Sequence, residues 1–197
     1  HYVPDTLTVN HKSGFYTNPV RLYFENTHPG NVTYYTLDAD EPDIESDIFT
    51  NDITLKDISN EKNRFADEVD NGHIPGRHIF KANVVRAIVY SGGCPASNEI
   101  SNTYFIHKNV KTRYEHVPVV SLITDKNNLF DPDEGIYTTG NFTNYDQRGK
   151  AWERDVHFEF FDTQGHQHID QNAGFRIHGR GSRGTPQKSL RDRKSVP

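Results

Sequence analysis

Apolar and polar residues alternate along much of the first half of the chain, with the period of two that is typical of half-buried β-strands. Val20, Leu22 and Phe24 share one face of such a strand. A turn with Pro and Gly at residues 28–31 separates this strand from a second alternating segment at residues 32–36. The two segments are therefore predicted to pair as a hairpin.

The strongest strand signal is VVRAIVY at residues 84–90, which is apolar enough for a central strand and ends at two glycines. Shorter strands are expected near residues 53–55 and 104–106. Strands at this spacing, with turn signals between them, predict an immunoglobulin-like or fibronectin-like β-sandwich.

The second half of the chain has its own β pattern. Residues 108–116 are polar and unpatterned, as expected of a linker, and residues 117–123 open a second unit with a strand. Apolar residues alternate at 156–160 and again at 175–177, which predicts a hairpin with a long polar connection. We therefore expect a mostly β protein.

Composition adds a charge asymmetry to this picture. Residues 1–170 carry 26 acidic residues against 15 Lys and Arg, whereas residues 171–197 carry one acidic residue against seven Lys and Arg. An acidic body argues against nucleic acid as a partner, since nucleic-acid binding needs a basic face. A basic end fits a local anion site better.

Other features bound the setting of the chain. No run of about 18 apolar residues is present, so no transmembrane segment is expected. Cys94 is the single cysteine and is expected to be an inert thiol. The chain begins at His1 and lacks methionine, which favours an internal fragment or a processed product. Asn31-Val-Thr33 and Asn141-Phe-Thr143 match the glycosylation sequon, a pattern that often arises by chance.

The main candidate site is the stretch GFRIHGRGSRGTPQKSLR at residues 174–191, where Gly179, Gly181 and Gly184 have the spacing G-x-G-x-x-G. Glycines at this spacing let backbone N–H groups approach an anion closely. Basic side chains can add charge-assisted donors to phosphate oxygens. The predicted nucleotide-binding residues are Arg180, Gly181, Ser182, Arg183 and Lys188.

Two other interpretations of this stretch stay open at this point. It could be a simple hairpin turn on a β-protein surface, because a lone G-x-G-x-x-G is a weak signal. A dinucleotide-binding loop fits less well, since a hairpin rather than a βαβ unit precedes it.

Two family resemblances add to these predictions from the sequence pattern. SGFYTNPVRLYF, NVTYYTLDADEPD, VVRAIVYSGG and NTYFI, within residues 10–107, resemble the chitobiase/β-hexosaminidase C-terminal type of β-sandwich domain, with an insertion at residues 44–70. PVVSLITDKNNLFDPDEGIY, WERDVHFEFFD and NAGFRIHGRGSRGTPQKSLR, within residues 118–191, resemble the start of the CotH family of spore-coat-protein-H-like atypical kinases.

The second resemblance implies phosphoryl transfer from ATP, with Mg²⁺, to Ser or Thr of a coat or surface protein. Ser182, Arg183 and Lys188 match the family's Ser-Arg…Lys signature, which makes Lys188 the phosphate-contacting lysine. The family's metal-binding and acid/base carboxylates lie downstream of Arg191, so the chain alone is expected to be inactive and to bind neither cofactor tightly. The family also implies a secreted, cell-surface or spore-coat location of bacterial type.

These observations give a domain layout. Residues 1–107 form the sandwich, 108–116 a linker, and 117–191 the truncated β-rich start of an α+β kinase domain. Residues 192–197 are hypothesised to be a non-native tail, because Asp-Arg-Lys-Ser is what the sequencing-adapter string GATCGGAAGAGC encodes and because charged residues there are not expected to continue a buried strand.

Several further side chains are candidate site residues. Two histidines at 166 and 168 flank a turn without an evident third metal ligand. Acidic residues at 125, 131 and 133 do not match a calcium loop. Glu159 alternates opposite the apolar face, where a basic loop residue is a conceivable partner, and Trp152 is expected to be an aromatic anchor.

The competing function is a non-catalytic adhesion, glycan-binding or spacer module. The first resemblance is to a domain that accompanies glycoside hydrolases, and Tyr34, Tyr35 and Trp152 are candidate aromatic platforms for a glycan. A spacer that supports the kinase part is the stronger of these alternatives, since no exposed aromatic row follows from the sequence.

Overall fold

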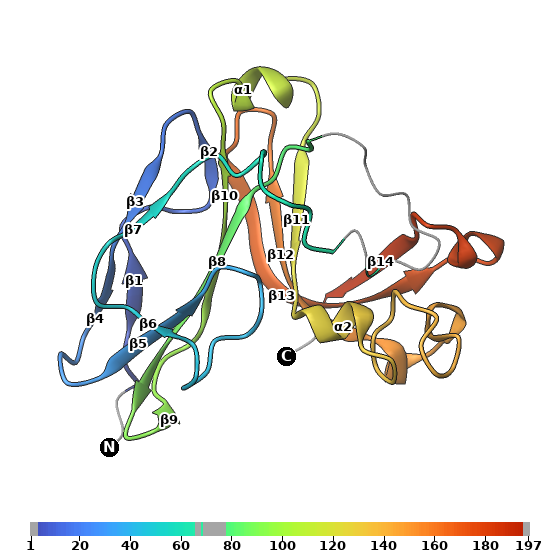
Figure 1. Cartoon of the computed structure of the whole chain (residues 1–197), viewed down its shortest axis with the longest axis horizontal. Helices are drawn as coiled ribbons and strands as arrows, with labels where there is room; N and C mark the ends of the chain where they lie inside the picture. Colours follow the sequence, from blue (N-terminus) through green and yellow to red (C-terminus); the bar gives the residue numbers. More distant parts are fainter. Residues whose placement is uncertain (1–3, 66–67, 69–77, 195–197) are drawn as a thin grey trace.

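The computed structural model describes residues 4–65, 68 and 78–194. Two β-rich units lie side by side (Figure 1). The first unit, which we call the sandwich, contains strands β1 to β10 and is coloured blue to green. The second, which we call the C-terminal sheet, contains strands β11 to β14 and is coloured yellow to red. The protein is mostly β, as predicted.

One layer of the sandwich is a sheet with the strand order β2-β10-β8-β5-β6, in which β9 also pairs with β8. The other strands form two antiparallel pairs, β1 with β4 and β3 with β7. The strands are β1 Leu7–Val9, β2 Gly14–Tyr16, β3 Val20–Leu22, β4 Phe24–Asn26, β5 Val32–Thr36, β6 Asp47–Ile48, β7 Ile53–Leu55, β8 Asn83–Ser91, β9 Cys94–Pro95 and β10 Ile100–Ile106.

Alternation places the sandwich core where the sequence predicts it. Val20, Leu22 and Phe24 are all buried in one cluster, which β8 completes with alternate residues. β8 lies between β10 and β5, so the prediction of a central strand is confirmed. Burying such side chains stabilises the fold by about 1.5–3 kcal/mol each.

The pairing of the first strands differs from the prediction. The turn at residues 28–31 is present, with the Asn31 amide donating to the His28 carbonyl at 2.9 Å. However, β4 pairs with β1 and β5 pairs with β8 and β6, so the predicted hairpin is wrong. The turn instead carries the chain from one layer to the other. The alternation of apolar residues indicates which face of a strand is buried, but it does not indicate which strand is its neighbour.

The C-terminal sheet has the order β11-β12-β13-β14, with all neighbours antiparallel. Its strands are β11 Val119–Ile123, β12 Arg154–Phe161, β13 Gln167–His178 and β14 Ser189–Lys194. The hairpin of β12 and β13 is confirmed, but its connection is a tight turn closed by the Gly165 amide on the Asp162 carbonyl. β14 continues past Arg191 to Lys194 at the end of the sheet order, with Asp192 opposite Phe175.

A long connection between β11 and β12 covers one face of this sheet. It contains helix α2 Lys126–Phe130 and the 3-10 turns η1 Asn144–Asp146 and η2 Lys150–Trp152. Ile136 of this connection is buried against Val156, Phe175 and Ile177 of the sheet. The covered face is therefore the core of the second unit.

The two units meet through a third apolar cluster. Phe15 of β2 and Phe105 of β10 pack on Phe161 of β12, with ring centroids 6.2 and 5.5 Å away. The predicted linker contributes to it, since residues 108–116 contain helix α1 Val110–Arg113, whose Val110 is fully buried. This stretch joins the units into a packed assembly rather than leaving them apart.

Buried polar groups complete this interface. Glu159 of β12 is 0% exposed and accepts hydrogen bonds from the Thr103 hydroxyl at 2.5 Å and the Gln167 amide at 2.9 Å. The Thr103 hydroxyl also lies 2.7 Å from the Ser121 hydroxyl. Thr103 belongs to the sandwich, so a carboxyl group from one unit is satisfied by the other.

Candidate functional site

The candidate phosphate site lies at residues 179–188, which we call the glycine loop. It connects the antiparallel strands β13 and β14 and contains the 3-10 turn η3 Gly181–Gly184. Gly179 has φ +114°, and a side chain there would overlap the Ser182 hydroxyl. A glycine is therefore required where the chain leaves β13.

Arg183 fixes the loop from inside. Its side chain is 5% exposed, and its guanidinium donates to four backbone carbonyls at 2.8–3.1 Å. These acceptors belong to Gly179, Ile177, Tyr145 and Gln147. Burial lowers the pKa of Arg183, and nearby Arg148 adds to this shift. Since four of the five guanidinium N–H groups are used, this side chain acts in holding the loop.

Lys188 is also buried, at 7% exposure. Its ammonium group donates to the Thr185 carbonyl at 2.9 Å and lies 4.4 Å from the centre of the Tyr145 ring and 5.2 Å from that of Tyr137. Its backbone amide donates to the Tyr137 hydroxyl, which in turn donates to the Pro186 carbonyl. Cation–π contact with two rings compensates for part of the lost hydration.

The five predicted nucleotide-binding residues thus fall into two groups. Arg180, Gly181 and Ser182 are exposed at the tip of the loop, and Arg183 and Lys188 are buried beneath it. The sequence did not indicate the supports, which are Tyr137, Tyr145 and Gln147 from the connection between β11 and β12. Their only signal is an aromatic-rich loop far away along the chain.

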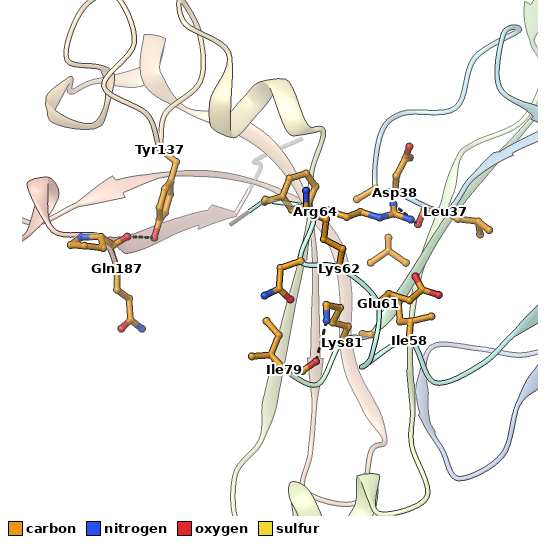
Figure 2. Close-up of a pocket in the computed structure, with 16 residues that line it drawn as sticks. Leu37, Asp38, Ile58, Glu61, Lys62, Arg64, Ile79, Lys81, Tyr137 and Gln187 are labelled. Atoms are coloured by element: carbon orange, nitrogen blue, oxygen red, sulfur yellow. Dashed lines mark hydrogen bonds between the residues drawn. The ribbon is translucent and has the colours of Figure 1, made fainter. Parts of the chain in front are cut away.

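A cleft of about 530 Å³ borders the glycine loop. Figure 2 shows Tyr137 and Gln187 on one side, and Lys62, Arg64 and Lys81 from the sandwich on the other. Apolar side chains that include Ile58 and Ile79 line it as well. Both units therefore contribute to a concave space of the size that small ligands occupy.

The histidines and acidic loop residues make local contacts. His166 and His168 both reach one Asp162 carboxylate oxygen, at 3.2 and 2.9 Å. The hydrogen bond from His168, joined by the His166 backbone amide, holds the pKa of Asp162 well below its usual range. Asp125 caps helix α2, and Asp131 accepts two backbone amides of its own turn. Within the described ranges, no three His, Cys, Asp or Glu residues are grouped as a metal site.

Glu159 does not face a basic loop residue. Its partners are hydroxyl groups and an amide at the interface of the units. Burial raises the pKa of Glu159, while hydrogen bonds from Ser13 and Thr103 oppose that shift. The conceived pairing with a basic loop residue is therefore wrong, because the residue faces the sandwich.

The three candidate aromatic platforms for a glycan do not form a row. Tyr34 and Tyr35 are neighbours on β5, so their side chains point to opposite faces of the sheet. Trp152 belongs to the other unit, where it packs on the core and lies 5.6 Å from the Arg154 guanidinium. The predicted role of Trp152 as an anchor agrees with this position.

Comparison with known proteins gives one match. The family model of the Chitobiase/beta-hexosaminidase C-terminal domain matches residues 11–66. No curated protein and no solved structure matches the chain. The resemblance of the sandwich to this domain is thus confirmed over the matched residues. In the part of the chain that the structure describes, no helix has the length and apolar character to cross a membrane.

Proposed function

We propose that the chain is the N-terminal part of a CotH-like protein kinase, in which the glycine loop holds the phosphates of ATP with Mg²⁺ and the intact protein phosphorylates Ser or Thr of an exported coat or surface protein. The observation that carries the proposal is the arrangement of exposed and buried residues in the glycine loop. Arg180, Gly181 and Ser182 are exposed at its tip, while buried Arg183 holds its backbone from within.

The chemistry of phosphoryl transfer asks for this kind of loop. Catalysis depends mainly on positioning and on neutralising phosphate charge, so a rigid backbone with exposed N–H groups and a nearby cation is useful. The Arg180 side chain is the exposed cation at the tip. The adjoining cleft gives space for the base and sugar of the nucleotide.

Arg183 and Lys188 have different roles within this proposal. Arg183 positions the loop, because its donors are occupied by carbonyls. Lys188 lies directly beneath the loop and would contact a phosphate by turning its ammonium group away from the Thr185 carbonyl. The exposed residues would meet the nucleotide first.

The test is a titration of the full chain with MgATP, followed by backbone amide NMR shifts, which detect weak binding. The amides of residues 180–182 should shift, and Arg180→Ala and Lys188→Ala should each weaken binding by about tenfold or more, the cost of losing one charge-assisted contact. Arg191→Ala is the matched control, because Arg191 is exposed on β14 outside the loop.

Two results would contradict the proposal. One is shifts that avoid residues 180–182, and the other is unchanged affinity in both loop variants with a native spectrum. Binding of a chitin oligosaccharide that ignores Lys188→Ala would instead favour the glycan-binding alternative.

A supporting role for the sandwich is the second proposal. The buried interface favours it, since Phe15 and Phe105 pack on Phe161 and Thr103 bonds to Glu159. A flexible spacer would not need such an interface. The sandwich would then hold the C-terminal sheet in place rather than bind a ligand of its own.

A further inference from the structure

The two sequons of the chain lie in different surroundings. A folded protein accommodates an N-linked glycan on an Asn-X-Thr sequence only where it leaves room for a bulky, hydrated group. The first sequon is Asn31-Val32-Thr33 at the start of β5, and the second is Asn141-Phe142-Thr143 in the connection between β11 and β12. The structure therefore distinguishes two motifs that look equivalent in the sequence.

Asn31 is tied to a buried carboxylate. Its side-chain amide donates to Asp5 Oδ2 at 2.9 Å, and the Thr27 amide donates to the other oxygen of Asp5 at 2.7 Å. Asp5 is 5% exposed. Burial alone would raise the pKa of Asp5, but hydrogen bonds from Thr27 and Asn31 hold it well below its usual range. The amide nitrogen that would carry a glycan thus points at a buried ionised group.

The third residue of the first sequon is buried as well. Thr33 is 6% exposed, and its hydroxyl accepts a hydrogen bond from the Asn26 amide at 3.4 Å. Asn31 is only partly exposed, so a glycan on its amide nitrogen would have to share a crowded site with the buried Asp5 and Thr33. Displacing the Asn31 amide would take one hydrogen-bond donor from a buried carboxylate.

The second sequon is exposed at all three positions. The Asn141 side-chain amide donates to Asp133 Oδ1 at 2.8 Å, and both side chains are on the surface. Phe142 is 56% exposed. N-glycosylation replaces one of the two amide hydrogens, and because Asn141 is exposed the glycan can extend into solvent while the remaining N–H keeps the bond to Asp133.

The backbone beneath Asn141 is well supported. The Asn141 amide donates to the Pro132 carbonyl at 2.7 Å, and the buried Asn144 side chain binds the Pro132 and Gly135 carbonyls at 3.0 Å. Gly140 has φ +49°, and a side chain there would overlap Asn144. The loop therefore presents Asn141 from a fixed base and does not depend on the Asn141 side chain for its own core.

We propose that Asn141 is the N-glycosylation site of the folded protein and that Asn31 is not. In the reaction, the Asn141 amide nitrogen forms a bond to the anomeric carbon of a lipid-pyrophosphate-linked oligosaccharide. The bond from that carbon to the pyrophosphate oxygen breaks, the amide loses one proton, and the lipid pyrophosphate leaves. The host's oligosaccharyltransferase supplies the donor and the catalyst, and the Thr143 hydroxyl completes the acceptor motif.

The experiment is expression of the full chain behind a secretion signal in yeast or insect cells. Folded material is selected by resistance to limited proteolysis, from the medium or, if the protein is retained, from the cell. Glycan removal by peptide-N-glycosidase in heavy-oxygen water marks each formerly glycosylated Asn by mass spectrometry. We expect the mark on Asn141 and not on Asn31, and one glycan per chain.

Matched variants keep Asn141 itself in place. Thr143→Ala should abolish the glycan, whereas Thr143→Ser should retain it, because the hydroxyl defines the sequon. Asn31→Gln should leave the glycan unchanged. The proposal is overturned if folded protein carries the mark on Asn31, if it carries none on Asn141, or if Asn141 is marked only in protease-sensitive material.

Discussion

Two buried charged side chains, Glu159 at the interface and Arg183 in the glycine loop, hold two regions of the molecule in different ways. Arg183 bonds only to backbone carbonyls of its own unit. Glu159 depends on the Thr103 hydroxyl of the sandwich as well as on Gln167 of its own sheet. Both groups satisfy the rule that a buried charge needs partners.

The difference concerns what each region needs in order to form. The glycine loop can be completed by the C-terminal sheet alone, since the acceptors of Arg183 lie on β13 and on the connection that covers the sheet. The interface needs both units, and without the sandwich Glu159 would lose a hydroxyl donor. We infer that the loop is a local structure of the C-terminal sheet, whereas the environment of Glu159 depends on contact between the two units.

The largest effect is expected for Phe161→Ala, which removes a fully buried ring between the units. A buried Phe→Ala change costs about 3–5 kcal/mol, because apolar burial is lost and a cavity remains. Urea unfolding of the full chain measures the free energy of unfolding. Phe142→Ala is the control, as this exposed ring should change stability by no more than about 0.5 kcal/mol. Equal costs for the two variants would show that the interface is not a packed one.

Arg183→Met comes next, with an expected loss of about 2–3 kcal/mol. Methionine keeps much of the apolar contact of the arginine stem but leaves buried carbonyls without donors. The cost of the lost hydrogen bonds is larger than the apolar contact that is retained. Amide hydrogen exchange should accelerate in residues 179–185 more than in the sandwich. The exposed Arg191→Met is the matched control, because Arg191 is not among the groups that act on Arg183. A uniform acceleration across both units would contradict the inference that the loop is a local structure.

Sequence patterns predicted the strands of both units better than their pairing. Alternation at Val20, Leu22 and Phe24 correctly indicated one buried face. It could not show that β5 pairs with β8 rather than with β4, since any neighbour satisfies the same alternation. The docking of Phe15 on Phe161 was equally hidden, because both residues fit the apolar pattern of their own unit.

For the candidate site, the sequence indicated the loop but not the distribution of roles within it. Arg180 and Arg183 look alike in GRGSRG, yet one is exposed and the other is buried against four carbonyls. Burial of Arg183 depends on Tyr145 and Gln147, which lie 36 to 38 residues earlier. Local spacing carries no information about such distant acceptors.

The smallest effect, and the one that separates the two buried charges, is expected for Glu159→Gln. Burial raises the pKa of Glu159 above its ordinary value of 4.5, so the folded state binds this proton more tightly than the unfolded state does. Stability from this group is therefore present at low pH and is lost as the pH rises through the folded pKa.

Glutamine does not titrate, so the stability of the variant relative to the wild type should increase as the pH rises above 4.5. Urea unfolding from pH 4.5 to 7.5 measures this difference, with the exposed Glu25→Gln as the control. Nearby His157 lowers the pKa of this carboxyl and Asp170 raises it, and both contributions are smaller than that of burial. A constant difference across this range would mean that Glu159 titrates as a hydrated carboxyl and that the interface admits water.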